Sequence, residues 1–264
     1  MKKQAKILKK LNSLLREIKC PRFLHHFGPK KYKFVQHATA LLLKEAFRLS
    51  FRRISNMLVL LEIKAPTYSA LCKSRKRIPL WIWNSLLKLT ARINNFNVAV
   101  DSTGFSLTNP SYYYTKRIDS KNPVKGYAKL SAFFDLRSKK FIALRIRAKP
   151  RHDINDVNYL LKQNNLMKKL FGDSAYDAES FHEKCFELKI QTIIKPRKNV
   201  KRGFYRRKQM RNYSEQEYHQ RSLIESGFGS LKRKYGSFVF GRNFCSRRTE
   251  IYCKAICHNL SLRD

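Results

Sequence analysis

The chain has 264 residues, of which 43% are hydrophobic, enough for one large domain or two small ones with cores of their own. Its 57 Lys and Arg residues outnumber 18 Asp and Glu residues, which gives a formal net charge of +39. Such apolar content excludes a disordered electrostatic tail. The charge therefore indicates a folded protein whose surface attracts a polyanion, and nucleic acid is the partner we expect.

The longest apolar runs, such as Met57 to Leu61, argue against a membrane protein. They are far shorter than the roughly 20 residues that cross a bilayer, and no signal-peptide pattern precedes them. Six irregularly spaced cysteines do not suggest a disulfide framework, so we expect an intracellular protein. A zinc site at Cys253, Cys257 and His258 is the less favoured interpretation, because cysteines spaced i, i+4 on a helix are usually buried.

The first part of the chain is predicted to be helical throughout. Residues 1 to about 20 alternate Lys with Leu and Ile, which is typical of a basic amphipathic helix, and Cys20-Pro21 ends it. Further helices are predicted over residues 34–47, over 49–61 with Ser50 as a cap, over 67–77, and from Trp81 to about Asn94.

The helix pair on either side of Ala65-Pro66-Thr67 has the layout of a helix-turn-helix. On that interpretation the basic end of the second helix contacts DNA, through Lys73, Arg75, Lys76 and Arg77. A small helical bundle with a solvated basic end explains the same pattern equally well.

After Asn97 the pattern changes to alternating strands and helices. Val98–Phe105 is predicted to be a short strand that reaches Asp101 and then a Gly turn. Residues 128–147 are predicted to form a hairpin that turns at about 137–138 and is served by Asp135.

Beyond the hairpin, helices and strands continue to alternate. The predicted elements are a helix from Asp153 to about Leu161, with Asp153 and Asp156 in its first turn, a strand from 166 that ends on Asp173, a helix over 178–188 capped by Asp177, a strand over 190–195, and a basic loop over 197–211. This order predicts a mixed α/β sheet.

A basic stretch near residue 220 predicts a functional helix. At about 100° per residue, a helix would place Tyr218, Arg221, Glu225 and Lys232 within about 60° of one another. An apolar stripe of Ile224, Phe228 and Leu231 would pack the helix down beside them. For the helix taken alone, an ordinary surface pair of Arg221 and Glu225 is the favoured interpretation, so the functional one needs carboxylate partners elsewhere in the chain.

Asp101 and Asp173 each follow a predicted strand, and carboxyl ends of neighbouring strands are where ligand groups converge in an α/β sheet. If the helix crosses that edge, Glu225 becomes a third carboxylate. Three carboxylates about 4 Å apart would repel strongly unless cations lie between them. Mg²⁺ is the ion that suits a few carboxylates and phosphate oxygens, and two such ions support phosphodiester chemistry.

These residues resemble the DDE transposases of bacterial and archaeal insertion sequences, in the IS4/IS5 group. The helix signature Tyr-x2-Arg-x3-Glu-x6-Lys is met in full from Tyr218 to Lys232. The resemblance covers about residues 96–262, including Arg151-His-Asp153, 194–198 and 258–260. Glu225 lies 52 positions after Asp173, so the large β insertion of some members is absent, and the resemblance does not carry over the hairpin mechanism tied to that insertion.

The resemblance implies a ribonuclease-H-like mixed sheet flanked by helices in a catalytic domain of residues 96–264. The helical pattern before it predicts an all-α, helix-turn-helix-like DNA-binding region of residues 1–95. Asp101, Asp173 and Glu225 would be catalytic and hold Mg²⁺, with Mn²⁺ as a substitute. Tyr218, Arg221 and Lys232 would contact DNA near the cleaved end. Lys195 and Arg197 lie beyond a strand end and are further candidates to contact the DNA backbone.

The resemblance also implies partners and a compartment. Double-stranded DNA, both the terminal inverted repeats and the target, would be bound by a homodimer in the bacterial or archaeal cytoplasm, associated with the nucleoid. Cleavage would free a 3′-hydroxyl that attacks target DNA. Two alternatives stay open: a nuclease of the same fold that cuts without joining, and an inactive or domesticated copy that only binds DNA.

Overall fold

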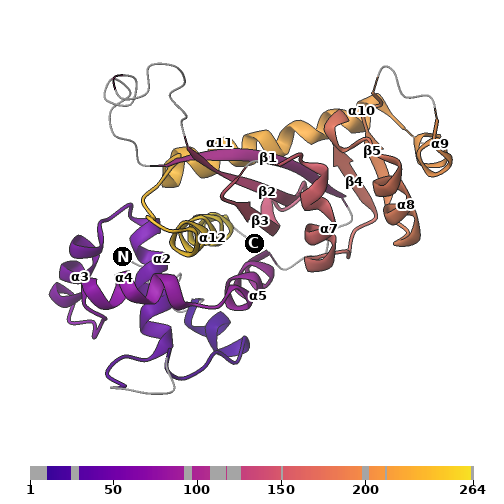
Figure 1. The fold of residues 1–264 in the computed structure, drawn as a ribbon. Helices are drawn as coiled ribbons and strands as arrows, with labels where there is room; N and C mark the ends of the chain where they lie inside the picture. The colour runs from indigo at the N-terminus through magenta and orange to yellow at the C-terminus, as the bar shows by residue number, and fades with distance from the viewer. Residues whose placement is uncertain are drawn as a thin grey trace. The chain divides into compact units, whose positions relative to one another are not determined.

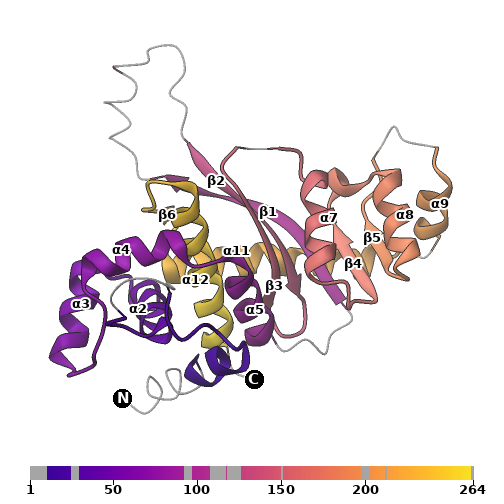
Figure 2. The same ribbon diagram turned by 60° about the horizontal axis from the view of Figure 1, so that its bottom comes forward.

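The computed structural model describes residues 11–24, 30–91, 97–107, 117, 126–149, 151–197, 202–211 and 213–262. The chain forms two compact units, one of residues 1–90 with 233–263 and one of residues 91–232 (Figures 1 and 2). The division into a DNA-binding region of residues 1–95 and a catalytic domain of residues 96–264 stays a prediction. Within the described ranges no helix is long and apolar enough to cross a membrane.

The first unit is helical, as predicted. Residues 11–17 continue the predicted first helix, whose residues 1–10 lie outside the described part, as does Asn94 at the predicted end of the last one. The other helices are α2 (Phe34–Ala46), α3 (Phe51–Leu60), α4 (Tyr68–Arg77), α5 (Leu80–Ala91) and α12 (Phe244–Ser261).

The helices of this unit begin at capped positions and share a core. Ser50 and Thr67 accept hydrogen bonds from the backbone at the starts of α3 and α4, which satisfies orphan N–H groups there. Apolar residues of α2, α3 and α4 form one buried cluster, which includes Ile54. Helix α12 packs on α2 and α4 and buries Cys253 and Cys257. All six cysteines are free thiols.

The second unit is built on a mixed sheet. Its strands are β1 (Asn97–Leu107), β2 (Tyr127–Asp135), β3 (Lys140–Arg147), β4 (Lys169–Gly172) and β5 (Gln191–Ile194). They lie in the order β3-β2-β1-β4-β5. The first three pair antiparallel, and β4 pairs parallel with both β1 and β5. This is the ribonuclease-H-like arrangement, so the predicted fold class is confirmed.

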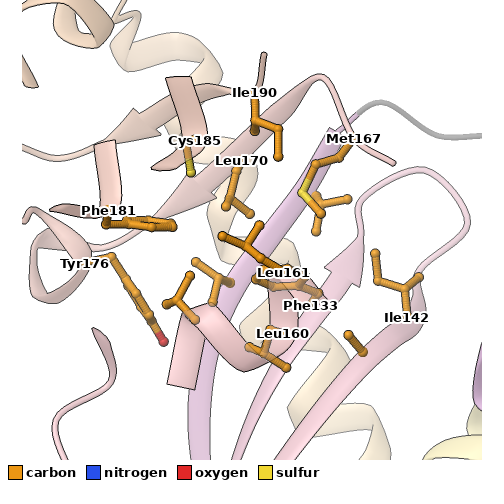
Figure 3. Close-up of a cluster of buried hydrophobic side chains, with 14 of the residues drawn as sticks. Phe133, Ile142, Leu160, Leu161, Met167, Leu170, Tyr176, Phe181, Cys185 and Ile190 are labelled. Carbon is orange, nitrogen blue, oxygen red and sulfur yellow. The ribbon is translucent and has the colours of Figure 1, made fainter. Parts of the chain in front are cut away.

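Helices cover both faces of this sheet. On one face, α7 (Ile154–Gln163) and α8 (Glu179–Glu187) bury a large apolar cluster against Val98, Val100 and Phe133 (Figure 3). On the other face lies α11 (Ser222–Tyr235), whose Phe228 ring stacks on Phe141 with centroids 5.6 Å apart. Alternation along β1 therefore turns even-numbered residues toward α7 and odd-numbered ones toward α11.

The prediction that β1 ends at Asp101 and turns at Gly104 is wrong. The strand continues to Leu107, with Asp101 opposite Ala132 and Gly104 opposite Lys129. The long partner strand β2 supplies hydrogen bonds along this stretch. Gly104 serves a close approach instead of a turn, because a Cβ there would lie 3.2 Å from the Tyr127 ring.

Residues 197–211 were predicted to be a loop, but they contain helix α9 (Phe204–Met210), while 198–201 lie outside the described residues. The Glu179 carboxylate accepts the backbone N–H groups of Tyr205 and Arg206, at 2.8 and 3.1 Å. A side chain distant in sequence thus satisfies the first turn of α9, and no local pattern could reveal that.

Four acidic residues were expected to act locally, and one does. Asp135 accepts two backbone N–H groups of the β2–β3 turn, as predicted. Asp153 stands at the N-cap of α7 without capping it, and Ala178, not Asp177, is the N-cap of α8. The carboxylates of Asp153 and Asp177 instead have partners far away in the sequence, which compete successfully with the local caps.

Two glycines on α11 make a matched test of how this helix packs. A Cβ on Gly227 would lie 2.6 Å from the Phe134 ring, whereas a Cβ on Gly229 would meet nothing within 4 Å. We expect Gly227→Ala to lower the free energy of unfolding by about 1–3 kcal/mol through overpacking. Gly229→Ala should raise it by up to about 1 kcal/mol through helix propensity. Urea titrations of both variants measure the difference, and equal effects would contradict this packing.

Candidate active site

Asp101 lies in the middle of the sheet, on the face that α11 covers. Because Thr103 is two positions on, it shares this face, and its hydroxyl accepts a 2.7 Å hydrogen bond from Lys232. The Asp101 side chain is 16% exposed and accepts the N–H of Ser102 at 2.8 Å. Strand β1 therefore presents a half-buried carboxylate to the helix that carries the basic signature.

Asp173 directly follows β4, the parallel neighbour of β1. Its carboxylate accepts the N–H of Ala175 at 2.9 Å and caps the short 3₁₀ helix η1 (Ser174–Tyr176). The parallel pairing brings Asp173 to the same part of the sheet as Asp101, as the sequence predicted for these two residues.

The single helix predicted around Tyr218 is interrupted by a tighter turn. Tyr218 ends α10 (Glu215–Tyr218), Arg221 ends the 3₁₀ segment η2 (His219–Arg221), and Glu225 and Lys232 belong to α11. Arg221 and Glu225 still meet, at 2.5 Å between guanidinium and carboxylate. The Tyr218 ring instead packs beside Tyr213, with centroids 6.0 Å apart.

Arg221 links Glu225 to Asp101. Its second terminal nitrogen lies 3.4 Å from the Asp101 carboxylate, so one guanidinium spans two carboxylates. Burial raises the pKa of Asp101 to about 6, against the lowering effects of the Ser102 N–H and Arg221. The negative charges of Asp173 and Glu225 add to that rise in pKa. The three carboxylates thus lie close enough to interact electrostatically.

Carboxylate oxygens are the ligands that Mg²⁺ prefers, so the chemistry of this donor set fits a divalent ion. Among the described residues, however, no three His, Cys, Asp or Glu side chains are grouped closely enough to hold one metal ion as they stand. The positive charge between Asp101 and Glu225 is that of Arg221. The site fits a metal if this guanidinium moves aside.

Behind the sheet, on the α7 face, lies a buried ionic network that sequence reasoning missed. Asp156 is fully buried and contacts Arg147 and the Ser131 hydroxyl. Asp153 accepts the Ser102 hydroxyl at 2.8 Å and pairs with Lys129. A signal did exist, because positions 153 and 156 are in phase with the apolar stripe of Val157, Leu160 and Leu161 on α7.

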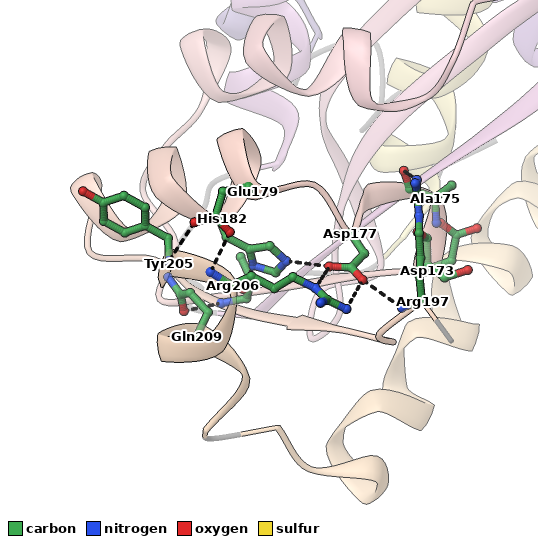
Figure 4. A network of polar contacts seen from close by, with 11 residues as sticks. Asp173, Ala175, Asp177, Glu179, His182, Arg197, Tyr205, Arg206 and Gln209 are labelled. Carbon is green, nitrogen blue, oxygen red and sulfur yellow. Dashed lines mark hydrogen bonds and ion pairs between the residues drawn. The ribbon is translucent and has the colours of Figure 1, made fainter. Parts of the chain in front are cut away.

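Asp177 was also missed as the centre of a network (Figure 4). The Arg206 guanidinium binds its carboxylate through two nitrogens, at 2.6 and 2.7 Å, and the Arg197 N–H donates at 2.8 Å. His182 bridges Asp177 and the Thr192 hydroxyl, at 3.1 and 2.8 Å. One buried carboxylate thereby ties α8, β5 and α9 to the loop that carries Asp173.

These contacts shift two pKa values. Burial alone would raise the pKa of Asp177, but hydrogen bonds from Arg206 and two further donors lower it. Burial lowers the pKa of His182 more than Asp177 raises it, so the imidazole is neutral. Both shifts make the network stable near neutral pH and sensitive to acid.

The remaining sequence-predicted DNA contacts are dispersed. Arg197 is exposed, and its guanidinium donates to the carbonyls of Ser174 and Ala175 beside Asp173, while Lys195 is exposed nearby. In the first unit, the basic end of α4 has Lys73, Lys76 and Arg77 exposed. Arg75 is only 11% exposed, lies 3.7 Å from Glu250, and faces the Phe51 ring.

Comparison with known proteins assigns the class. A family model described as a transposase DDE domain matches residues 97–260. The chain belongs to this family, and it is a DDE transposase, as the sequence resemblance indicated.

Two solved structures are similar to it in part. A Mos1 transposase paired-end complex with left transposon end is 12% identical, with 88% of this chain and 76% of that chain covered at a TM-score of 0.25. A pre-cleavage Mos1 transpososome is 13% identical, with 88% and 77% covered at a TM-score of 0.24. Likenesses this remote add no argument, so the assignment rests on the family match.

The Asp177 network predicts a specific loss of stability. Asp177→Asn leaves the buried Arg206 guanidinium without its charged partner and should lower the free energy of unfolding by about 3–5 kcal/mol at pH 7. Glu187→Gln, at an exposed site on the adjacent helix α8, is the matched control and should change it by less than about 0.5 kcal/mol. Urea unfolding followed by circular dichroism measures both.

Acid should remove this difference. Because the folded pKa of Asp177 is lowered, its stabilisation is complete above the unfolded value of about 3.9 and is lost as pH falls through the folded value. The difference in the free energy of unfolding between the wild type and Asp177→Asn should accordingly be unchanged from pH 7 to 5 and shrink below about pH 4. A difference in the free energy of unfolding that grows in acid would contradict the assigned direction of the pKa shift.

Proposed function

We propose that this transposase cleaves DNA at the ends of its element and joins the freed ends to target DNA. The carrying observation is that three carboxylates come to one part of the sheet: Arg221 contacts both Asp101 on β1 and Glu225 on α11, and Asp173 follows β4, the parallel neighbour of β1. Their convergence from distant parts of the sequence matches the triad that the family resemblance implies. A basic surface around such a triad favours a polyanionic substrate.

We propose that Asp101, Asp173 and Glu225 hold two Mg²⁺ ions, which Mn²⁺ can replace. When bound, such ions activate an attacking hydroxyl and stabilise the leaving oxygen. The chain's own contribution is to position the carboxylates. Asp101 is oriented by the Ser102 N–H and Asp173 by the Ala175 N–H, so two of the three proposed ligands have backbone donors that set their direction.

The proposed reaction has two steps at the same carboxylates. In cleavage, a water oxygen bonds to phosphorus as the bond to the 3′ oxygen breaks, which leaves a 3′-hydroxyl and a 5′-phosphate. In joining, that 3′-hydroxyl oxygen bonds to a target phosphorus, and the displaced target 3′ oxygen takes up a proton. Arg221 and Lys232 would then lie where they can bind phosphate oxygens next to the reacting bond.

DNA binding would involve both parts of the chain. Tyr218, Lys195 and Arg197 are proposed to contact the element end in the catalytic domain, residues 96–264. Residues 1–95, with Lys73, Arg75, Lys76 and Arg77, are proposed to read the terminal repeat. Because the proposed reaction acts on two element ends, which must be brought together, we propose a homodimer.

Glu225→Gln and Asp173→Ala should each reduce cleavage by at least about 100-fold, because loss of one carboxylate removes a metal ligand. The assay is a gel of labelled DNA carrying the inverted repeats that flank the gene, with Mg²⁺ or EDTA. Glu187→Gln is the control and should cleave at the wild-type rate.

The possible results of this assay separate the alternatives. Nicking without joining would identify a nuclease of the same fold, and retarded DNA without any product would identify a copy that only binds. Wild-type nicking by Glu225→Gln would refute the assigned triad.

Arg221 provides a test of metal binding that does not depend on activity. Since its guanidinium spans Asp101 and Glu225, Arg221→Gln should tighten Mn²⁺ binding about tenfold by removing a competing positive charge. Titration of DNA-free protein with Mn²⁺, followed by electron paramagnetic resonance, measures the affinity. Arg211→Gln, an exposed site with the same change of net charge, is the control. Weaker binding by Arg221→Gln would show that Arg221 supports the metal site.

A further inference from the structure

A groove of about 1190 Å³ opens on the second unit next to Asp173, whose carboxylate accepts the N–H of Ala175 in the groove wall. Another part of the wall is Ser102 to Gly104 of β1, where Ser102 and Gly104 turn toward α7 while Asp101 turns toward α11. The groove therefore adjoins Asp173 and lies across β1 from the Asp101 carboxylate. The side chains on this part of its wall are small, so a ligand can approach the backbone closely.

An aromatic ring stands in this groove in an unusual setting. Tyr127 lines the groove and is 42% exposed. The ring lies against Gly104 of the neighbouring strand, where a Cβ would be only 3.2 Å from it. One face of the ring is thus supported by the sheet while the side chain stays open to the groove. A fixed, exposed aromatic ring is a platform on which a nucleic-acid base can stack.

Two arginines supply the exposed positive charge of the groove. Lys129 lines the groove, but its charge is offset by Asp153. Arg151 and Arg197 also line the groove and are exposed. Arg197 is held in place by the carbonyls of Ser174 and Ala175, at 2.8 and 3.0 Å. The groove thus combines a Lys129 charge that is offset with two exposed guanidinium groups. This combination suits a DNA strand whose nucleobases enter the groove and whose phosphates contact the two arginines.

The size of the groove limits what it can hold. Pockets for drug-sized ligands measure about 300–1,000 Å³, so this groove has room for on the order of one to three nucleotides. In a duplex, base faces are covered by neighbouring base pairs and are closed to Tyr127. A short unpaired stretch exposes these faces and is the form of nucleic acid that aromatic platforms bind.

We propose that this groove binds a short unpaired stretch of DNA next to Asp173, with one base stacked on Tyr127 and phosphates at Arg151 and Arg197. The inference rests on the proposed function, because it extends the DNA substrate into the groove. It assigns to Tyr127, which the helix signature does not include, the role of holding an unpaired strand in the groove that adjoins Asp173. No contact from the first unit is needed.

The binding test uses the full chain, excess EDTA and a fluorescein-labelled oligothymidine, so that cleavage plays no part. Tyr127→Phe keeps the ring and should bind as the wild type does. Tyr127→Leu still covers Gly104 but cannot stack, and should bind about 5- to 100-fold more weakly. Phe204→Leu is the control, because Phe204 is 64% exposed on α9 and does not line the groove. Fluorescence anisotropy measures the dissociation constants.

A second readout locates the base. An oligonucleotide with 5-iodouracil should crosslink to Tyr127 on irradiation, and mass spectrometry identifies the modified peptide. Arg151→Gln tests the phosphate contact at an exposed site that folding does not require, and should reduce the slope of log affinity against log salt by about 0.7. Arg137→Gln, on the exposed hairpin turn, should reduce it less.

Equal binding by Tyr127→Leu and the wild type, or crosslinks only outside the groove, would overturn the inference. An equal loss of affinity in Phe204→Leu would also overturn it, since binding would then not be specific to the groove. These results are independent of catalysis. Stacking without any metal-dependent product would support the groove and refute the proposed reaction. Product formation without stacking would support the reaction and refute the groove.

Discussion

The position of β1 between an antiparallel and a parallel neighbour is the constraint on which the site depends. Pairing with β2 keeps the strand extended past Asp101, and parallel pairing with β4 brings Asp173 to the same region. A carboxylate held there is partly cut off from water, which raises the pKa of Asp101. The partly buried Asp101 carboxylate is stabilised by nearby positive charge, and Arg221 supplies that charge.

Neighbouring residues of β1 face opposite sides of the sheet, where charges are compensated to different degrees. Asp101 turns toward α11, where its charge is only partly compensated, while Ser102 turns toward α7 and joins a network in which acidic groups have basic partners. Asp177 gives similar support on the far side of Asp173. The carboxylates of the proposed triad are therefore set between two well-paired ionic networks, which limits their freedom to rearrange.

Much of this could be predicted from the sequence because it follows from local patterns. The helices of the first unit, the hairpin after residue 128 and the strand before Asp173 all show periodicity or caps, and the helix signature located Glu225. The predictions that failed concern residues whose partners lie far along the chain. Asp153 and Asp177 are suited to capping, yet Lys129 and Arg206 bind them, and the path of β1 beyond Asp101 depends on the length of β2.

The contact between Gly227 and the Phe134 ring has a consequence for sequence variation among relatives. The backbone of α11 approaches the sheet so closely that its depth is set by a missing side chain. A relative with alanine at position 227 would have to carry a smaller residue at 134, or place Glu225 farther from Asp101. The two positions, distant in sequence and neither of them charged, should covary, and relatives that broke the pairing should be those that have lost the triad.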